Sequence, residues 1–180
     1  PQARALYMYM YAHPGKKLNF MGNELGHFRE WDEKRELDWD LITYPAHDAF
    51  RHFMKDLCRI YQEHPALWKK DYDREGFRWL DCHEEEKCVY AFLRTDGEEE
   101  ILAVFNLSDR DVKAFALEVP EGTWELLLNS DRDIYGGGTI SKGKRKRLFQ
   151  KKDRDADGRL LLDLPAFGGI YLRKDSSEEK

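Results

Sequence analysis

The sequence predicts a helix–strand–helix unit of the α/β class followed by an all-β sandwich. Apolar residues recur at helical spacing in residues 2–13 and 45–63, on either side of a short apolar run. After residue 65 the pattern changes to short apolar runs, separated by turn residues at intervals of about 8 to 12 residues. Since 41% of the 180 residues are hydrophobic and 13% are aromatic, the chain can bury a sizeable core.

The first 64 residues hold the elements of a single α/β unit. The first helix ends at Pro14–Gly15, and Leu18–Met21 predicts a short buried strand. A long loop over residues 22–45 leads to a second helix over residues 45–63, with proline in its first turn. The apolar face of the first helix is formed by Ala3, Leu6, Tyr7 and Met10. That of the second helix is formed by Phe50, Phe53, Met54, Leu57, Ile60 and Tyr61. One such unit cannot close a core by itself.

The remainder of the chain has the pattern of a β-sandwich. Turn dipeptides stand at Asp96–Gly97, Glu121–Gly122 and Asp157–Gly158, between runs rich in β-branched and aromatic residues. The predicted strands are 77–82, 87–94, 100–107, 112–119, 123–129, 146–151, 159–164 and 169–173. We expect the polar tail from Lys174 to be frayed.

The composition argues against nucleic acid and membranes as partners. Charged residues make up 36% of the chain, yet the net charge is only -5. No apolar run reaches the length of roughly 18 residues that a membrane span needs, and no signal peptide is recognisable. The basic residues of segment 142–152 favour a solvated loop, with binding of a phosphate-bearing polymer as the less favoured alternative.

The sequence predicts no metal site and no cofactor. Cys58, Cys82 and Cys88 lack metal-ligand spacing, and we expect three reduced thiols in a cytosolic protein, although Cys82 and Cys88 are placed to face each other across a hairpin. Residues 153–158 resemble the start of a calcium loop, but Leu164 stands where the bidentate acid belongs. A hairpin turn explains that segment better, and the six histidines share no ligand spacing.

A longer set of motifs carries a resemblance to a known family. The chain closely resembles bacterial glycogen branching enzymes of the α-amylase superfamily over the eighth barrel strand and the loop that follows it. The motifs lie at residues 13–24, 26–31, 34–39, 64–68, 76–77, 79, 129–131 and 135–137. The chain departs from the family pattern at Leu25, His27 and Asp32, where Phe, Gln and Asn are expected. Segment 139–158 is longer and more basic than usual, and residues 166–169 are atypical.

The resemblance implies the last helix–strand–helix of a (β/α)₈ barrel over residues 1–64, followed by a Greek-key β-sandwich domain over residues 65–180. Ligands of such barrels bind at the carboxyl ends of the strands, and three residues follow the predicted strand directly. Asparagine offers a donor and an acceptor, and glutamate offers acceptors, which suits sugar hydroxyls. The predicted substrate-binding residues are Gly22, Asn23, Glu24, His27, Trp31 and Trp39. The alternative is that Glu24 pairs with a barrel arginine and that both tryptophans only pack the loop.

The resemblance also implies a reaction class, a partner and a location. Branching is a retaining glycosyl transfer that uses two carboxylates about 5–5.5 Å apart. In this superfamily these carboxylates follow earlier barrel strands, so no residue of this sequence matches them. We therefore expect a cytoplasmic parent enzyme that acts on α-glucan, and a fragment without activity of its own. Its further partner is the N-terminal part of the barrel.

Three alternatives remain open from the sequence. The first is the end of another α-amylase-superfamily enzyme, such as a trehalose-forming or debranching relative. The second is a free-standing glucan-binding or interaction module, and a nucleic-acid-binding module ranks third. An isolated barrel remnant is also expected to expose the apolar faces of residues 18–21 and 46–63, and thus to self-associate.

Overall fold

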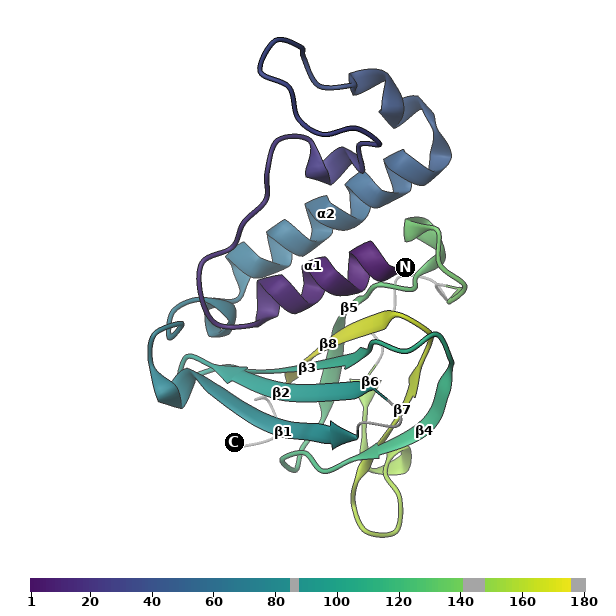
Figure 1. Cartoon of the computed structure of the whole chain (residues 1–180). Helices are drawn as coiled ribbons and strands as arrows, with labels where there is room; N and C mark the ends of the chain where they lie inside the picture. Colours follow the sequence, from purple (N-terminus) through teal and green to yellow (C-terminus); the bar gives the residue numbers. More distant parts are fainter. Residues whose placement is uncertain (85–87, 141–147, 176–180) are drawn as a thin grey trace.

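Two helices lie against one face of a β-sandwich (Figure 1). The computed structural model describes residues 1–84, 88–140 and 148–175. Its two α-helices are α1 (Gln2–Ala12) and α2 (Pro45–Glu63). Short 3₁₀ turns are η1 (Asn23–Leu25), η2 (Trp39–Thr43), η3 (Pro65–Leu67), η4 (Arg74–Gly76), η5 (Asp133–Tyr135) and η6 (Lys151–Asp153).

The strands of the described residues form two antiparallel sheets. They are β1 (Phe77–Glu84), β2 (Val89–Thr95), β3 (Glu100–Asn106), β4 (Val112–Leu117), β5 (Trp124–Asn129), β6 (Leu148–Phe149), β7 (Leu160–Leu164) and β8 (Gly168–Lys174). The larger sheet has the order β1-β2-β3-β8-β5-β6, and β4 pairs with β7 in the smaller one. The predicted β-sandwich is therefore confirmed.

The larger sheet is the central layer, because both of its faces are buried. Along β3, Ile101, Ala103 and Phe105 pack towards the helices, whereas Leu102 and Val104 pack towards the small sheet. This division follows from the strand geometry, in which successive side chains point to opposite faces. The helices and the sandwich consequently share one core, and the division into two domains at residue 64 stays a prediction.

The buried faces of the two helices differ in how well the sequence predicts them. Helix α2 buries Phe53, Met54, Leu57 and Ile60, which confirms the predicted face. The predicted face of α1 is correct only for Tyr7 and Met10, which pack against the core, since Leu6 is 65% exposed. The residues that α1 buries are Arg4, Ala5, Met8, Tyr11 and Ala12. Apolar side chains surround most of α1, so helical spacing alone does not select the face that packs.

Residues 18–21 do not form the predicted buried strand. Residues 18–20 have no regular structure, Met21 lies in a turn, and Leu18 is 72% exposed. A strand exists only where a neighbouring strand satisfies its backbone groups, and none of the described strands pairs with this run. The expectation for residues 46–63 is also wrong, because the apolar face of α2 is buried against the sandwich.

The remaining expectations concern turns, thiols and possible metal ligands. Asp155 accepts hydrogen bonds from the backbone N–H groups of Asp157 and Arg159, which confirms the hairpin turn. None of the three cysteines forms a disulfide in the described part of the chain. No cluster of three or more potential metal ligands occurs among the described residues.

Of the basic segment, residues 141–147 lie outside the described residues, and Lys151 and Lys152 are exposed. Within the described part of the chain, neither helix has the length and apolar character required to cross a membrane.

Candidate functional site

The predicted site begins with a tight turn after residue 21. Gly22 has φ 81° and Gly26 has φ 65°, so both glycines adopt the left-handed conformation on either side of η1. A Cβ atom on Gly22 would lie 2.8 Å from the ring of His27. Glycine at position 22 is therefore required both by the backbone conformation and by the close approach of the imidazole. The buried Nε2 of His27 has no hydrogen-bond partner among the described residues.

Helix α2 holds this turn in place. The buried side chain of Leu25 points into the protein, and the carbonyl oxygen of Leu25 lies 2.7 Å from Nδ1 of His47 on α2. Because a carbonyl group only accepts, His47 donates in this bond. The same imidazole packs edge-to-face against Phe28 at a centroid distance of 4.9 Å. The turn is thus anchored to α2 through both a hydrogen bond and a ring contact.

Polar side chains lie on the outer side of this turn. Asn19 donates from Nδ2 to Oε2 of Glu24 over 3.4 Å. Burial raises the pKa of Tyr7, an effect that a hydrogen bond with Asn23 opposes and the charge of Glu24 reinforces. Asn23 and Glu24 therefore both lie near the α1 residue Tyr7. The group offers amide donors and carboxylate acceptors, the combination that recognises sugar hydroxyls.

Aromatic residues flank the polar group. Trp31 is 42% exposed and packs edge-to-face on Phe20 at 5.5 Å. Trp39 opens η2 and is 54% exposed. No described aromatic ring is in ring contact with Trp39. Both indoles present apolar surface to their surroundings, as a stacking sugar ring or a protein partner requires.

An arginine closes the loop that carries the two tryptophans. Arg29 donates from Nε and Nη2 to the two carboxylate oxygens of Asp38, each over 2.8 Å, and from Nη2 to the carbonyl of Glu36 over 2.9 Å. The Arg29 guanidinium holds the pKa of Asp38 below its usual range. This bidentate contact joins residues that are nine positions apart in the chain.

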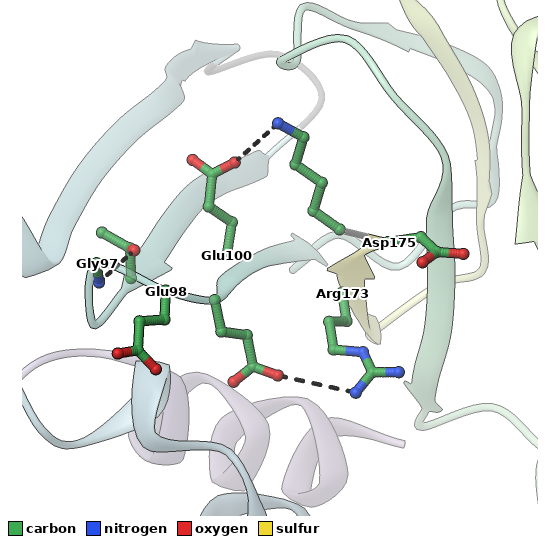
Figure 2. A pocket seen from close by; sticks show the side chains of 8 residues that line it. Gly97, Glu98, Glu100, Arg173 and Asp175 are labelled. Atoms are coloured by element: carbon green, nitrogen blue, oxygen red, sulfur yellow. Dashed lines mark hydrogen bonds and ion pairs between the residues drawn. The ribbon is translucent and has the colours of Figure 1, made fainter. Parts of the chain in front are cut away.

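A separate cavity of about 420 Å³ lies at the β2–β3 turn and the end of β8 (Figure 2). Its charges are largely paired with one another, since Glu100 contacts Lys174 at 3.6 Å and Glu99 contacts Arg173 at 4.0 Å. Glu99 also lies 2.7 Å from Nδ1 of His64, at the end of α2. This ion-paired network joins the helices to the sandwich and is distinct from the turn at Gly22.

The sandwich of this chain matches a known family of domains. A family model described as the alpha amylase C-terminal all-beta domain matches residues 79–175, which is more than half of the chain. The chain belongs to this family. The match begins in β1 and ends after β8, so it covers the sandwich, and the helices and the loop with the predicted site precede it.

The similarity to individual proteins also covers the two helices that precede the sandwich. The 1,4-alpha-glucan branching enzyme GlgB of Aquifex aeolicus is 40% identical over 175 residues, which is 96% of this chain and 28% of that enzyme. The enzymes of the same name from Cereibacter sphaeroides and Thiobacillus denitrificans are 42% and 38% identical over 94% of the chain. This chain spans 24% and 23% of their lengths, and thus about a quarter of the curated relatives it matches.

The structure brings most of the predicted site residues of this family member together. Gly22 and His27 are in contact, Asn23 and Glu24 stand beside them, and Trp31 packs on a neighbouring segment. Trp39 lies apart from them on η2. Sequence reasoning missed Asn19, Phe20, Arg29 and Asp38. The available signal for Arg29 and Asp38 was a basic residue and an acidic residue near the two ends of a loop that contains tryptophan.

Proposed function

We propose that this chain is the C-terminal portion of a 1,4-α-glucan branching enzyme, which makes α-1,6 branches in glycogen by retaining glycosyl transfer. The observation that carries the proposal is a similarity to enzymes of that name that runs through the helices, the loop and the sandwich alike. A free-standing copy of the sandwich would need no such likeness in residues 1–64. The cytoplasmic location remains part of this proposal.

Residues 1–64 are, in this proposal, the end of a catalytic (β/α)₈ barrel. The support is a set of large exposed apolar side chains on α1 and on the chain between the two helices. Its exposed members are Leu6, Leu18, Phe20, Met21, Phe28, Trp31, Trp39, Ile42 and Tyr44. Exposed apolar surface of this extent is typical of an interaction site. The rest of the barrel covers part of it, and residues 18–21 acquire strand partners there.

Substrate contact is proposed for the turn at Gly22 and the loop that follows. The closely spaced amide and carboxylate groups of Asn23 and Glu24 suit glucan hydroxyls, and Trp31 and Trp39 suit the flat faces of pyranose rings. The imidazole of His27 lies against Gly22 in the same turn. These residues bind and orient the glucan, and the two reacting carboxylates come from the preceding part of the barrel.

A chimera tests the parent activity. The segment of the Aquifex aeolicus enzyme that matches this chain is replaced by residues 1–180, and branching of amylose is followed by the fall in iodine absorbance. We expect the chimera to branch amylose, the enzyme lacking that segment to be inactive, and the 180-residue chain alone to leave the absorbance unchanged. A fall in absorbance with the chain alone would contradict the proposed inactivity, and a folded but inactive chimera would contradict the proposed parent.

A free-standing glucan-binding module is the second candidate, favoured by the exposed indoles of Trp31 and Trp39. Native electrophoresis of the chain through gels with and without glycogen discriminates the two. Strong retardation by glycogen without any chimera activity supports the module. Chimera activity supports the enzyme, whatever the mobility of the isolated chain.

A further inference from the structure

The loop between η1 and η2 is fixed at its two ends and exposed between them. Its first end is tied to α2 through the bond between Leu25 and His47, and its second end enters η2, where Leu41 is buried. Between these anchors nearly every residue of segment 30–36 is exposed. An exposed loop of this length samples many conformations unless a specific contact restricts it.

The Arg29–Asp38 pair is the contact that restricts the loop. Its guanidinium forms two parallel bonds to one carboxylate and a third bond to the carbonyl of Glu36, so it fixes direction as well as distance. A lysine ammonium lacks this planar fork and cannot reproduce the bidentate geometry. Such a pair contributes to local order more than to overall stability, since both side chains remain partly exposed to water.

The two members of the pair stand directly beside the tryptophans. Arg29 is two residues before Trp31, and Asp38 immediately precedes Trp39. The bond between Arg29 and Asp38 therefore ties together the two stretches of backbone that carry Trp31, which packs on Phe20, and Trp39. Glu24 and His27 lie on the arm of the loop that leads into Arg29. The Arg29–Asp38 pair, called the clamp below, therefore also links the segment that carries the tryptophans to the turn.

We propose that Arg29 is a positioning residue, which through Asp38 and the carbonyl of Glu36 holds Trp31 and Trp39 in the arrangement that meets the glucan. The identity of the ligand rests on the proposed function, whereas the ordering of the loop does not. Arg29 itself touches no reacting atom. Its role is to make the aromatic surface available without the entropic cost of ordering the loop on binding.

Acid gives the clamp a characteristic signature. Asp38 faces Arg29, His27 and Arg35, and Arg29 faces Asp32 as well as Asp38. The hydrogen bond from Arg29, followed by these positive charges, lowers the pKa of Asp38, so the carboxylate stays ionised below the usual range of an aspartate. The order that the clamp contributes is thus fully present above the ordinary aspartate pKa and is lost only as the pH falls through the depressed one.

The test uses the full 180-residue chain labelled with 5-fluorotryptophan, whose signals are assigned with the W31F and W39F variants. Fluorine NMR and amide hydrogen exchange over residues 26–38 are compared for the wild type, R29M, R29K and D38N. R51M is the matched control, because Arg51 makes a comparable partly exposed pair with Asp48 on α2.

We expect R29M and D38N to shift the Trp31 and Trp39 signals towards the solvent-exposed position and to speed exchange in the loop by about tenfold. R29K should restore little of the order, and R51M should leave both readouts unchanged.

Four results would overturn the proposal. The first is a wild-type pattern of loop exchange and indole signals in R29M. The second is an equal effect of R51M, and the third is a shift of all five tryptophan signals together, which would indicate general destabilisation. An acid titration of the loop signals that D38N does not abolish also counts against it. Retardation in glycogen gels is read separately: a loop that loosens in R29M with unchanged retardation rejects the glucan contact and leaves the positioning role intact.

Discussion

Two arginines, each with three hydrogen bonds, hold two very different regions of the molecule. Arg94 on β2 is 0% exposed and joins the end of α1, the segment before β1 and the sheet, through bonds to Ala12, Gly76 and Asp71. Arg29 joins two arms of a surface loop through Asp38 and Glu36. Arg94 bonds three separate groups and Arg29 bonds two, but the larger difference between them is burial.

Burial decides what each arginine contributes. Arg94 lies at the junction between the end of α1, the segment before β1 and the strand β2. Water is excluded from this junction, so every polar group left there without a partner carries its full desolvation cost. At the loop, water replaces a lost partner, so the consequence of losing the bond is local disorder. The comparison suggests that the junction determines whether the helices and sandwich fold together, whereas the loop clamp determines only how the aromatic residues are presented.

Removal of the junction arginine is expected to have the largest effect. R94M leaves the carbonyls of Ala12 and Gly76 without this partner in a buried site, and leaves the carboxylate of Asp71 with only the more distant ammonium of Lys17. We expect a loss of about 3–5 kcal/mol in the free energy of unfolding, measured by urea denaturation. The loop variant R29M is the counterpart and should leave the urea midpoint nearly unchanged. Similar midpoints for both variants would remove the distinction between the two regions.

A glycine at the junction gives the next largest effect. A Cβ atom on Gly76 would lie 2.4 Å from the backbone oxygen of Lys70. Because this obstacle is backbone beside a buried site, it cannot move aside cheaply. We expect G76A to lower the free energy of unfolding by about 2–3 kcal/mol in the same urea experiment. Gly138, which also has no positive φ and whose added Cβ would meet only the Asp131 carboxylate at an ordinary 3.6 Å, provides a control for the generic effect of alanine.

A glycine at the loop should give a smaller and more local effect. A Cβ atom on Gly22 meets only the side chain of His27, but the backbone φ of 81° remains unfavourable for alanine. We expect G22A to cost about 1–2 kcal/mol. In the double variant G22A/H27A the steric part disappears and the backbone part remains. A double-mutant cycle measures this difference, and strict additivity of the two changes would contradict the proposed ring contact.

The sandwich was predictable from sequence because its signals are local. The continuous apolar run along β3 and the turn at Asp96–Gly97 mark the strands β2 and β3 to within a residue or two. The run Leu18–Met21 misled for a physical reason. Apolar character predicts burial, but the strand partners that would provide it are not encoded in the run itself, and here it lies exposed.

The candidate site was predictable only in part for a related reason. Residues 22–24 and His27 are close in sequence, so a turn motif brings them together. The contacts of Arg29 and Arg94 depend on how the chain returns, and an arginine within a strand such as β2 gives no local indication that it is buried. The sequence shows which residues are charged, but only the structure identifies their partners.

Lys17 provides the smallest expected effect and ties the junction to the start of the loop. Its ammonium donates to the carbonyl of His13 and lies 3.8 Å from Asp71, which Arg94 also contacts. Burial lowers the pKa of Lys17, Asp71 opposes this, and the positive charge of Arg94 reinforces it. Because the folded protein holds this proton less tightly than the unfolded chain, the unfolded chain binds more protons in the window between the depressed pKa and the ordinary value of 10.5. The free energy of unfolding contributed by Lys17 therefore rises with pH through that window.

The variant K17M isolates this contribution from that of the tyrosines. Burial raises the pKa of Tyr7, Tyr9 and Tyr61, so ionisation of these phenols in the unfolded chain lowers stability at high pH in both proteins. The difference in unfolding free energy between wild type and K17M, measured from about pH 8 to pH 10, removes that common part. We expect the wild type to gain stability relative to K17M as the pH rises. A difference that stays flat or falls would mean that Asp71 outweighs burial and Arg94 at this site, and that the junction tolerates a second cation at no cost.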